Sequence, residues 1–382
     1  MKIAIDIRRM NEFGVGTYTR NIIRALARLD RENKYFLLGP QEKVNEIGKL
    51  PENFKSIPVL GPDTVRGYVQ CQEVVSRLGC DLVHVPHLFW LPRHLPCPYV
   101  LTVHDMLEHM YRARSGSGLK RSLHFYLTRR VVQNAARIFA VSRFTKSEVE
   151  KLFGIDPSRI EVIYNAIDHR FLSGHASDAD RQFLAERYQV TYPFLLYAGR
   201  ISPHKNLVRI IEAFSALKAD LTKHDLYPDL KLIIIGDELS KHPDLRRTVV
   251  RGGVQNDVRF LGFVPIEVLR IFYDAAKVFV FPSLYEGFGI PVAEALACGV
   301  PVVTSNISSL PEAGATLALT VDPTDTEAMA EAIYKALTDE AVRERCRSHA
   351  SSVAQRFSAQ TMVEQTIAVY EQAAALQASQ RH

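Results

Sequence analysis

The sequence lacks several patterns that would settle its chemistry at once. Its five cysteines are scattered and form no C-x-x-C pair, so we expect reduced thiols rather than a disulfide framework or a cysteine metal site. It contains no G-x-x-x-x-G-K-[ST] phosphate loop, which argues against an NTPase. No run approaches the roughly 20 apolar residues that span a bilayer, and Asp6 interrupts the first apolar stretch. We therefore expect a cytoplasmic protein without a secretory signal.

What is present is the composition of a globular α/β protein. The 382 residues are 47% hydrophobic and 23% charged, with a formal net charge of +5, and this length suggests two or three domains. Short β-branched runs alternate with longer helical patterns from end to end, which predicts parallel sheets. Thirteen such runs lie between residues 2 and 321, and they fit two doubly wound sheets better than one.

A polar segment separates the two halves of the chain. Residues 173–180 have no apolar periodicity and are rich in turn formers, so we predict an interdomain linker over residues 173–190. Near the other end, apolar residues recur at helical spacing after Ser358. They predict a closing helix that packs on one of the two domains.

Open α/β sheets bind ligands beyond the carboxyl ends of their strands, and the loop after the predicted strand 277–282 has the strongest pattern. Gly287 and Gly289 permit positive φ and close backbone approach. Pro291 suits the first position of a helix that ends at Gly299. The free N–H groups at such a helix start carry about half a positive charge. The predicted anion site consists of the amides of Phe288, Gly289 and Ile290.

Two carboxylates flank this predicted anion site. Glu286 precedes the helix, and we expect Glu294 in its first turn. Acids do not attract a phosphate, but carboxylates are good acceptors for sugar hydroxyls, so the combination predicts a ligand with an anionic centre between polyols, such as a sugar nucleotide. The alternative is that Glu294 stabilises the helix dipole and Glu286 is a solvated loop residue. The glycines and the proline together favour the ligand site.

A second loop supplies cations. Arg200 and Lys205 lie between a predicted strand and the helix that follows it, and they can neutralise a diphosphate leaving group without a metal. Solvated basic side chains are the alternative, because loop Lys and Arg are common. Asp178 and Asp180 match a D-x-D pattern that holds metal in other sugar-nucleotide enzymes. They lie in the predicted linker rather than at a strand end, so we predict no metal site.

Two loops in the first half have weaker patterns. Gly14-Val15-Gly16 lets the backbone approach a phosphate or an acceptor group, but the third glycine of G-x-G-x-x-G is absent, which argues against an NAD(P) site. His104 ends an apolar strand and is placed to hydrogen-bond a reacting sugar, with Asp105 able to orient the imidazole. A structural His–Asp pair explains the same two residues equally well.

These residues resemble a known family. Glu286 and Glu294 are similar to the E-x7-E motif of the retaining glycosyltransferases with the GT-B fold, in particular glycosyltransferase family four. The ordered matches span nearly the whole chain. The other matching segments are Gly14–Gly16, Val103–Asp105, Ala140–Phe144, Tyr164–Asp168, Gly199–Asn206, Phe260–Val264 and Ala297–Val303.

The resemblance implies two Rossmann-like domains that face a central cleft. An N-terminal acceptor-binding domain would span residues 1–172 and include the returning helix at residues 359–382. A C-terminal nucleotide-sugar-binding domain would span residues 191–358. Transfer would proceed with retention and without a metal or other cofactor, with the leaving phosphate taking the proton of the acceptor.

The resemblance also implies residue roles. Glu294 would bind the nucleotide ribose and Glu286 the hydroxyls of the donor sugar. Arg200 and Lys205 would hold the diphosphate, with help from the three amides of the anion site. His104 would contact the donor sugar near its anomeric centre. The remaining implied contacts are Phe263 and Val264 to the base, and Gly14, Val15 and Gly16 to a phosphate or the acceptor.

The whole chain resembles bacterial mannosyltransferases that build O-antigens and exopolysaccharides. This resemblance implies GDP-mannose as the donor and a glycan or polyprenyl-diphosphate-linked glycan as the acceptor. A UDP-sugar-dependent glycosyltransferase, a sugar-nucleotide epimerase on a similar fold and a non-catalytic nucleotide-sugar-binding protein are the alternatives.

Basic residues are concentrated between Arg112 and Lys151. Within this stretch Leu123, Tyr126 and Val131 recur at helical spacing beside several cations. This pattern predicts peripheral contact with the inner face of the plasma membrane through residues 112–130. The alternative is a surface helix whose apolar stripe packs on the sheet. No aromatic and basic module typical of nucleic-acid binding is present, so we predict no nucleic-acid partner.

Overall fold

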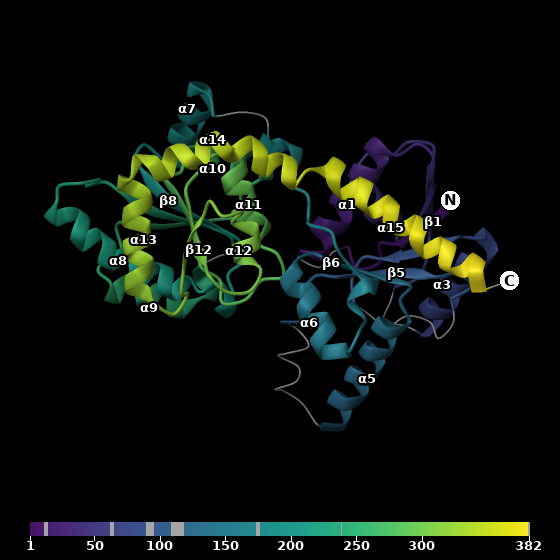
Figure 1. Ribbon diagram of the computed structural model, residues 1–382. Coiled ribbons are helices and arrows are strands. Elements are labelled where there is room, and N and C mark those ends of the chain that lie inside the picture. The colour runs from purple at the N-terminus through teal and green to yellow at the C-terminus, as the bar shows by residue number, and fades with distance from the viewer. Residues whose placement is uncertain are drawn as a thin grey trace. The chain divides into compact units, whose positions relative to one another are not determined.

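The computed structural model describes residues 1–10, 14–61, 65–88, 95–107, 118–172, 176–237 and 239–380. The chain forms two compact units (Figure 1). Unit 1 comprises Met1–Ala166 and Ser358–His382, and unit 2 comprises Ile167–Phe357. Each unit is built on one parallel sheet, so the predicted α/β class with two Rossmann-like sheets is confirmed.

Unit 1 contains a seven-stranded sheet. Its strands are β1 (Lys2–Asp6), β2 (Lys34–Leu38), β3 (Phe54–Ile57), β4 (Leu82–Val85), β5 (Tyr99–Val103), β6 (Arg137–Ala140) and β7 (Ile160–Val162). Its α-helices are α1 (Val15–Leu29), α2 (Gln41–Ile47), α3 (Val65–Leu78), α5 (Gly118–Asn134), α6 (Arg143–Phe153) and α15 (Ala359–Gln380). The strand order is β3-β2-β1-β4-β5-β6-β7. The order reverses between β1 and β4, which makes this the switch point of the sheet.

The sheet of unit 1 separates two cores, because successive strand residues face opposite sides. Ile3 and Ile5 of β1 pack in one core with α1 and α15, whereas Ala4 packs in the other core with α3, α5 and α6. Every residue of β1 after Lys2 is buried. Burial on both faces explains why Ile3, Ala4 and Ile5 form a continuous apolar run rather than an alternating pattern.

Unit 2 contains a six-stranded sheet. Its strands are β8 (Phe194–Ala198), β9 (Lys231–Ile235), β10 (Val258–Gly262), β11 (Val278–Phe281), β12 (Val302–Ser305) and β13 (Leu319–Val321). Its α-helices are α7 (Asp178–Tyr188), α8 (Leu207–Lys223), α9 (Pro243–Arg251), α10 (Ile266–Ala275), α11 (Ile290–Ala297), α12 (Leu310–Ala313), α13 (Thr326–Thr338) and α14 (Glu340–Arg356). The strand order is β10-β9-β8-β11-β12-β13. Here the order reverses between β8 and β11.

The structure differs from the linker predicted over residues 173–190. Residues 173–175 lie outside the described residues, but α7 occupies most of the rest, and the two units divide between Ala166 and Ile167. Few side chains of α7 are buried. The helix was missed in the sequence because its apolar face is short, and its polar start has the composition of a loop.

The start of α7 explains the D-x-D pattern. The Ser177 hydroxyl accepts the N–H of Asp180 at 3.2 Å, and the Asp180 carboxylate accepts the N–H of Ser177 at 3.0 Å. This is a capping box, which satisfies N–H groups at a helix start. Asp180 also pairs with Arg270 at 3.3 Å. Asp180 therefore caps a helix and pairs with an arginine.

Helix α15 returns to unit 1, as the resemblance implied. It runs beside α1 (Figure 1, yellow). Met362, Val363 and Tyr370 enter the core that contains Ile3 and Ile5. The first unit therefore closes its core with the last helix of the chain.

Candidate functional site

The loops after β8 and β11 meet at the switch point of unit 2. The β8 loop spans residues 199–206 and the β11 loop spans residues 282–289, and the two strands pair directly. The N–H of Leu284 donates to the carbonyl of His204 at 2.7 Å. Topology therefore brings together the two segments that the sequence indicated separately.

Asn206 fixes the position of these loops. It is buried and has a φ of 65°, a left-handed conformation that asparagine tolerates. Its Nδ2 donates to the carbonyls of Pro282, at 3.0 Å, and Pro323, at 2.7 Å. One side chain thus joins the segments that follow β8, β11 and β13. In the sequence, Asn206 is marked only as the last residue of the matching segment Gly199–Asn206.

Lys205 and Glu286 form an ion pair across the two loops. The Lys205 Nζ lies 2.5 Å from the Glu286 Oε1, and the side chains are only 17% and 13% exposed. The same ammonium lies 5.0 Å from the centroid of the Phe281 ring, a distance that permits a cation–π contact. Partial burial reduces solvent screening, so this pair is stronger than a typical surface salt bridge.

The backbone of Glu286 is held from the other side by two serines that follow β12. Its N–H donates to the Ser308 hydroxyl at 3.3 Å, and its carbonyl accepts the Ser309 hydroxyl at 2.9 Å. Ser309 is fully buried. These two serines were not identified from the sequence, because their role depends on a contact between loops that are more than 20 residues apart.

Helix α11 begins after Gly289, close to where the sequence predicted it. Gly289 has a φ of 99°, and a Cβ there would lie 2.7 Å from the Leu310 Cδ2, so both conformation and packing require glycine. The N–H groups of Gly289 and Ile290 have no acceptor within the described part of the chain. Pro291 is the second helical residue rather than the first, and the helix ends at Ala297.

Glu294 lies in the second turn of α11, not in the first turn as predicted, because the helix starts at Ile290. Its Oε2 accepts the hydroxyl of buried Tyr273 at 3.2 Å. Burial raises the pKa of Glu294 from its ordinary value of 4.5 to about 8, and the charge of Asp168 acts in the same direction. The alternative role as a first-turn dipole acid therefore does not fit the structure.

Three glycines leave the carboxyl ends of β8, β9 and β10 without side chains. Gly199 donates its N–H to the carbonyl of Ile235 at 2.9 Å, and Gly236 donates to the carbonyl of Gly262 at 3.1 Å. A Cβ on Gly236 would lie only 2.2 Å from the Gly199 oxygen. Beside them, the Asp237 carboxylate accepts the N–H of Ile201 at 3.0 Å. Gly236 and Asp237 were not singled out in the sequence.

The remaining predicted contacts of unit 2 differ in exposure. Arg200 is exposed and directly follows Gly199. Phe263 is 88% exposed at the end of β10, whereas Val264 is buried. The Phe263 ring is therefore open to a ligand, and the buried side chain of Val264 leaves only its backbone for such a contact.

In unit 1, His104 is held by a carbonyl rather than by the predicted Asp105. Its Nε2 lies 2.7 Å from the Pro86 oxygen, and the Asp105 carboxylate instead accepts the N–H of Leu107 at 2.9 Å. A carbonyl only accepts, so the proton is on Nε2 and Nδ1 has a free lone pair. Burial lowers the pKa of His104 to about 4. The imidazole is therefore neutral at physiological pH.

The glycine loop of unit 1 has a structural explanation. Gly14 has a φ of 72°, and a Cβ on Gly16 would lie 2.0 Å from the Met10 carbonyl oxygen. Gly16 is thus required by the close approach of the start of α1 to the Met10 carbonyl, whatever ligand approaches it. Val15 is the first residue of α1. The preceding residues of this loop, 11–13, lie outside the described residues.

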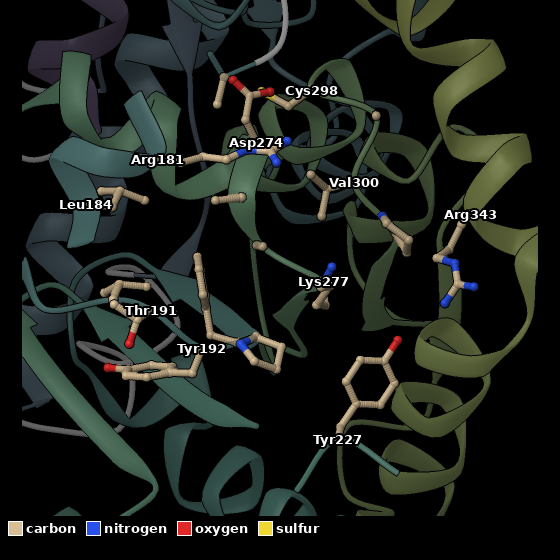
Figure 2. A pocket seen from close by; sticks show the side chains of 18 of the residues that line it. Arg181, Leu184, Thr191, Tyr192, Tyr227, Asp274, Lys277, Cys298, Val300 and Arg343 are labelled. Atoms are coloured by element: carbon tan, nitrogen blue, oxygen red, sulfur yellow. The ribbon is translucent and has the colours of Figure 1, made fainter. Parts of the chain in front are cut away.

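A hollow of about 1,120 Å³ lies at the opposite end of the sheet of unit 2 (Figure 2). Lys277 and Pro301, which directly precede β11 and β12, line it together with Arg181 of α7 and Arg343 of α14. Arg343 is paired with Glu340. This hollow contains none of the predicted site residues, so cavity size does not mark the candidate site.

Comparison with known proteins identifies the family. A family model described as Glycosyltransferase Family 4 matches residues 14–171, and one described as Glycosyl transferases group 1 matches residues 178–353. The O-antigen chain mannosyltransferase B of Escherichia coli is 34% identical over 296 residues, covering 76% of this chain and 74% of that protein. The chain belongs to glycosyltransferase family 4. The predicted family and enzyme class are therefore confirmed, and the protein is a glycosyltransferase.

Further comparisons agree with this assignment. The serotype-specific mannosyltransferase WbdA of Escherichia coli is 31% identical over 69% of this chain. The matched part is only 32% of the length of that protein. A glycosyltransferase from Rickettsia africae has a TM-score of 0.75 at 18% identity, covering 97% of this chain and 98% of that one. Anabaena Alr3699/HepE in complex with UDP-glucose has a TM-score of 0.74 at 18% identity, covering 97% and 100%. These structures establish the GT-B fold.

The raised pKa of Glu294 predicts how the stability of unit 2 changes with pH. Between pH 4.5 and about 8 the unfolded chain has released this proton while the folded protein retains it. Stability is therefore lost as the pH rises through this window, by up to about 1.4 kcal/mol per pH unit. Glu294→Gln has no carboxyl to titrate at this position. The Tm of the variant minus the Tm of wild type should therefore increase by about 3 °C for each pH unit between pH 5 and 8.

Glu331→Gln is the matched control, because Glu331 is exposed on α13. Its Tm difference from wild type should be the same at every pH. Thermal unfolding followed by circular dichroism at half-unit pH intervals makes both measurements. Parallel pH profiles for Glu294→Gln and wild type would show that the Glu294 carboxyl is not held protonated.

Proposed function

We propose that this glycosyltransferase moves a mannosyl group from GDP-mannose to a glycan or lipid-linked glycan, with retention of anomeric configuration and without a metal ion. The observation that carries the proposal is the Lys205–Glu286 pair at the switch point of unit 2. It puts a cation for a diphosphate beside an acceptor for sugar hydroxyls. The mannosyltransferase names of the relatives support the choice of sugar.

In this proposal, cations and amides bind the diphosphate. Lys205 exchanges its partner from the Glu286 carboxylate to a phosphate oxygen, and exposed Arg200 neutralises further charge. The N–H groups of Gly289 and Ile290, at the start of α11, donate to the same anion. These groups stabilise the leaving nucleoside diphosphate as its negative charge increases, which is the main electrostatic requirement of this transfer.

The two acids recognise the polyols on either side of the diphosphate. Glu286, once released by Lys205, accepts hydrogen bonds from hydroxyls of the donor sugar. Glu294 faces the ribose, and the energy of its hydrogen bonds to the ribose diol favours the ionised carboxylate. The exposed ring of Phe263 and the backbone of Val264 border the base.

His104 acts as a hydrogen-bond acceptor in this mechanism. Because its Nε2–H is used by the Pro86 carbonyl, only the Nδ1 lone pair is left for a sugar hydroxyl. With a pKa lowered to about 4, the imidazole carries no second proton to donate. We therefore propose that the acceptor oxygen bonds to the anomeric carbon on the face from which the diphosphate leaves. The bond between that carbon and the diphosphate oxygen breaks, and the acceptor proton passes to the departing phosphate oxygen, so the configuration is retained.

Alanine at Lys205 or Glu286 is expected to lower kcat by about 10²–10³-fold, because each removes a charge that acts on the reacting diphosphate sugar. The measurement is transfer from GDP-mannose to a mannose-terminated glycan with EDTA present. Lys231→Ala is the matched control: its ammonium pairs with Asp257 at 2.8 Å and lies 5.8 Å from the Tyr192 ring, at the other end of the sheet. Similar rates for the three variants would contradict the site.

A panel of GDP- and UDP-sugars should identify the donor through thermal stabilisation. GDP-mannose at about 100 times its Kd should stabilise the folded protein by about 2.7 kcal/mol, and Lys205→Ala should lose most of that shift. Thermal stabilisation by a UDP-sugar alone would mean that the donor is a UDP-sugar rather than GDP-mannose. The UDP-glucose in the HepE structure favours this possibility.

Two further outcomes of this panel would point to a different class of protein. A new sugar nucleotide formed without an acceptor would indicate an epimerase. Binding with no turnover under any condition would indicate a non-catalytic protein. The absence of any shift across the whole panel would contradict the proposed function.

We further propose that α5 attaches unit 1 to an anionic membrane. Its Leu123 and Tyr126 side chains are 56% and 63% exposed, and Arg129 is exposed on the same helix, whereas Val131 is buried in the core. The predicted apolar stripe is therefore divided between core and solvent. Arg112 and Arg114 lie outside the described residues, as do the side chains of Leu119, Lys120 and Arg121. Among the described helices, none has the length and apolarity needed to cross a membrane.

Vesicle binding tests this attachment. The double variant Leu123→Ser/Tyr126→Ser should bind vesicles of phosphatidylglycerol and phosphatidylcholine at least about tenfold more weakly than wild type, because apolar burial and cation attraction act together. Leu60→Ser/Val69→Ser is the control, since those side chains are 44% and 51% exposed elsewhere on unit 1. Equal loss in both double variants, or no binding by wild type, would contradict the proposal.

A further inference from the structure

A row of buried polar side chains crosses the core of unit 1. The Tyr370 hydroxyl lies 2.6 Å from the His84 Nδ1, and the His84 Nε2 lies 2.8 Å from the Thr102 hydroxyl. The Thr102 hydroxyl lies 3.2 Å from the Tyr18 hydroxyl. We refer to these four residues, Tyr370, His84, Thr102 and Tyr18, as the Tyr370–Tyr18 row. It links α15 through β4 and β5 to α1.

Each side chain of the row depends on its hydrogen-bond partners within the row. All four side chains are at most 2% exposed, so a group that loses its partner has no water to replace it. A neutral imidazole has one donor and one acceptor, and both ring nitrogens of His84 are used. Burial lowers the pKa of His84 to about 3, so the ring keeps this arrangement across the physiological range.

The row ends against His104. The Tyr18 ring meets the His104 imidazole edge to face, with centroids 4.7 Å apart and an interplanar angle of 78°. The hydroxyl of that same tyrosine is the terminal member of the row. Thr102 lies in β5, two residues before His104, and its hydroxyl lies 3.2 Å from the Tyr18 hydroxyl. The position of the Tyr18 ring therefore depends on Thr102.

The backbone of His104 is fixed independently. The Thr145 hydroxyl donates to its carbonyl at 3.3 Å, and Thr145 is itself held by Ser142, whose hydroxyl accepts its N–H at 2.9 Å. The remaining freedom is rotation of the imidazole about its side-chain bonds. The Pro86 carbonyl and the Tyr18 ring restrict that rotation.

We propose that the Tyr370–Tyr18 row positions the imidazole of His104 for the transfer reaction, so that Tyr370 of the C-terminal helix acts on the site through three intermediate side chains. The inference rests on the proposed role of His104 as a sugar contact. The four residues of the Tyr370–Tyr18 row are positioning residues, because none of them touches the sugar in this mechanism. A purely structural row would attach α15 to the sheet and leave His104 unaffected.

Tyr370→Phe breaks the row at its far end while keeping the ring that fills the core. The expected result is a fall in kcat of about tenfold or more, because small displacements of a reacting contact are costly. The affinity for GDP alone should not change. The matched control is Tyr35→Phe: Tyr35 is fully buried in the same core, and its hydroxyl donates to Asp30 at 2.5 Å rather than to the row. It should lower Tm comparably and keep kcat within about twofold.

NMR spectra of ¹⁵N-labelled histidine provide a readout that a structural role would not move. Tyr370→Phe and Thr102→Val should shift the His104 ring nitrogens and introduce the second tautomer, whereas Tyr35→Phe should leave them at the wild-type positions. If Tyr370→Phe matches Tyr35→Phe in both kcat and the His104 signals, the proposal is overturned.

The two readouts also separate this inference from the proposed function. If wild type transfers no sugar from any donor, the function fails, and the His104 signals alone decide whether the row positions the ring. If His104→Ala transfers at the wild-type rate while the wild-type enzyme is active, the row has no catalytic role, and this inference is overturned although the transferase activity stands.

Discussion

A carboxylate and an ammonium 2.5 Å apart, each less than a fifth exposed, define the candidate donor site. Removing two charges from water is costly unless they are paired, so Lys205 and Glu286 hold each other in place while no ligand is bound. The surrounding hydrogen bonds serve this contact: Asn206 fixes one loop, and Ser308 and Ser309 fix the other. A diphosphate sugar offers a replacement partner to each charge. We propose that the pair is a preorganised site in which such a ligand exchanges partners instead of ordering loose side chains.

Burial keeps two other groups, the Glu294 carboxyl and the His104 imidazole, uncharged, although it shifts their pKa values in opposite directions. Burial raises the pKa of the Glu294 carboxyl, whereas it lowers the pKa of the His104 imidazole. Both effects favour the neutral form, as desolvation requires. The residues assigned to hydroxyls are polar without being permanently charged, apart from Glu286, whose charge Lys205 balances.

The sequence predicted the sheets well, because strands that are buried on both faces leave an unmistakable apolar run. Thirteen runs were expected in two parallel sheets, and the described part of the chain contains thirteen strands in two parallel sheets. The strand–loop–helix order then placed Lys205 and Glu286 at one edge, although their contact depends on the order β8-β11 in space. That order is not local in the sequence. Family resemblance, rather than periodicity, supplied the expectation that α15 returns to unit 1.

The errors have local physical causes. Helix α7 was interpreted as a linker because its capping box consists of residues that also form turns. Pro291 favours the first helical position and so predicts Glu294 in the first turn, whereas the helix starts at Ile290, directly after Gly289, which puts Glu294 in the second turn. Asp105 was expected to orient His104 because the two are adjacent, but adjacent residues at a strand end point apart, and a carbonyl from the neighbouring β4 segment takes that role.

The return of α15 also affects how the protein is made. Unit 2 is one continuous stretch, Ile167–Phe357, so all of its contacts are available once that stretch has left the ribosome. Unit 1 must wait, because Met362, Val363 and Tyr370 complete the core around its first strand. Strand β1, which is synthesised before all of unit 2, thus reaches its native packing only after α15 has been made. A nascent chain lacking its final segment holds a finished second unit attached to an unfinished first one.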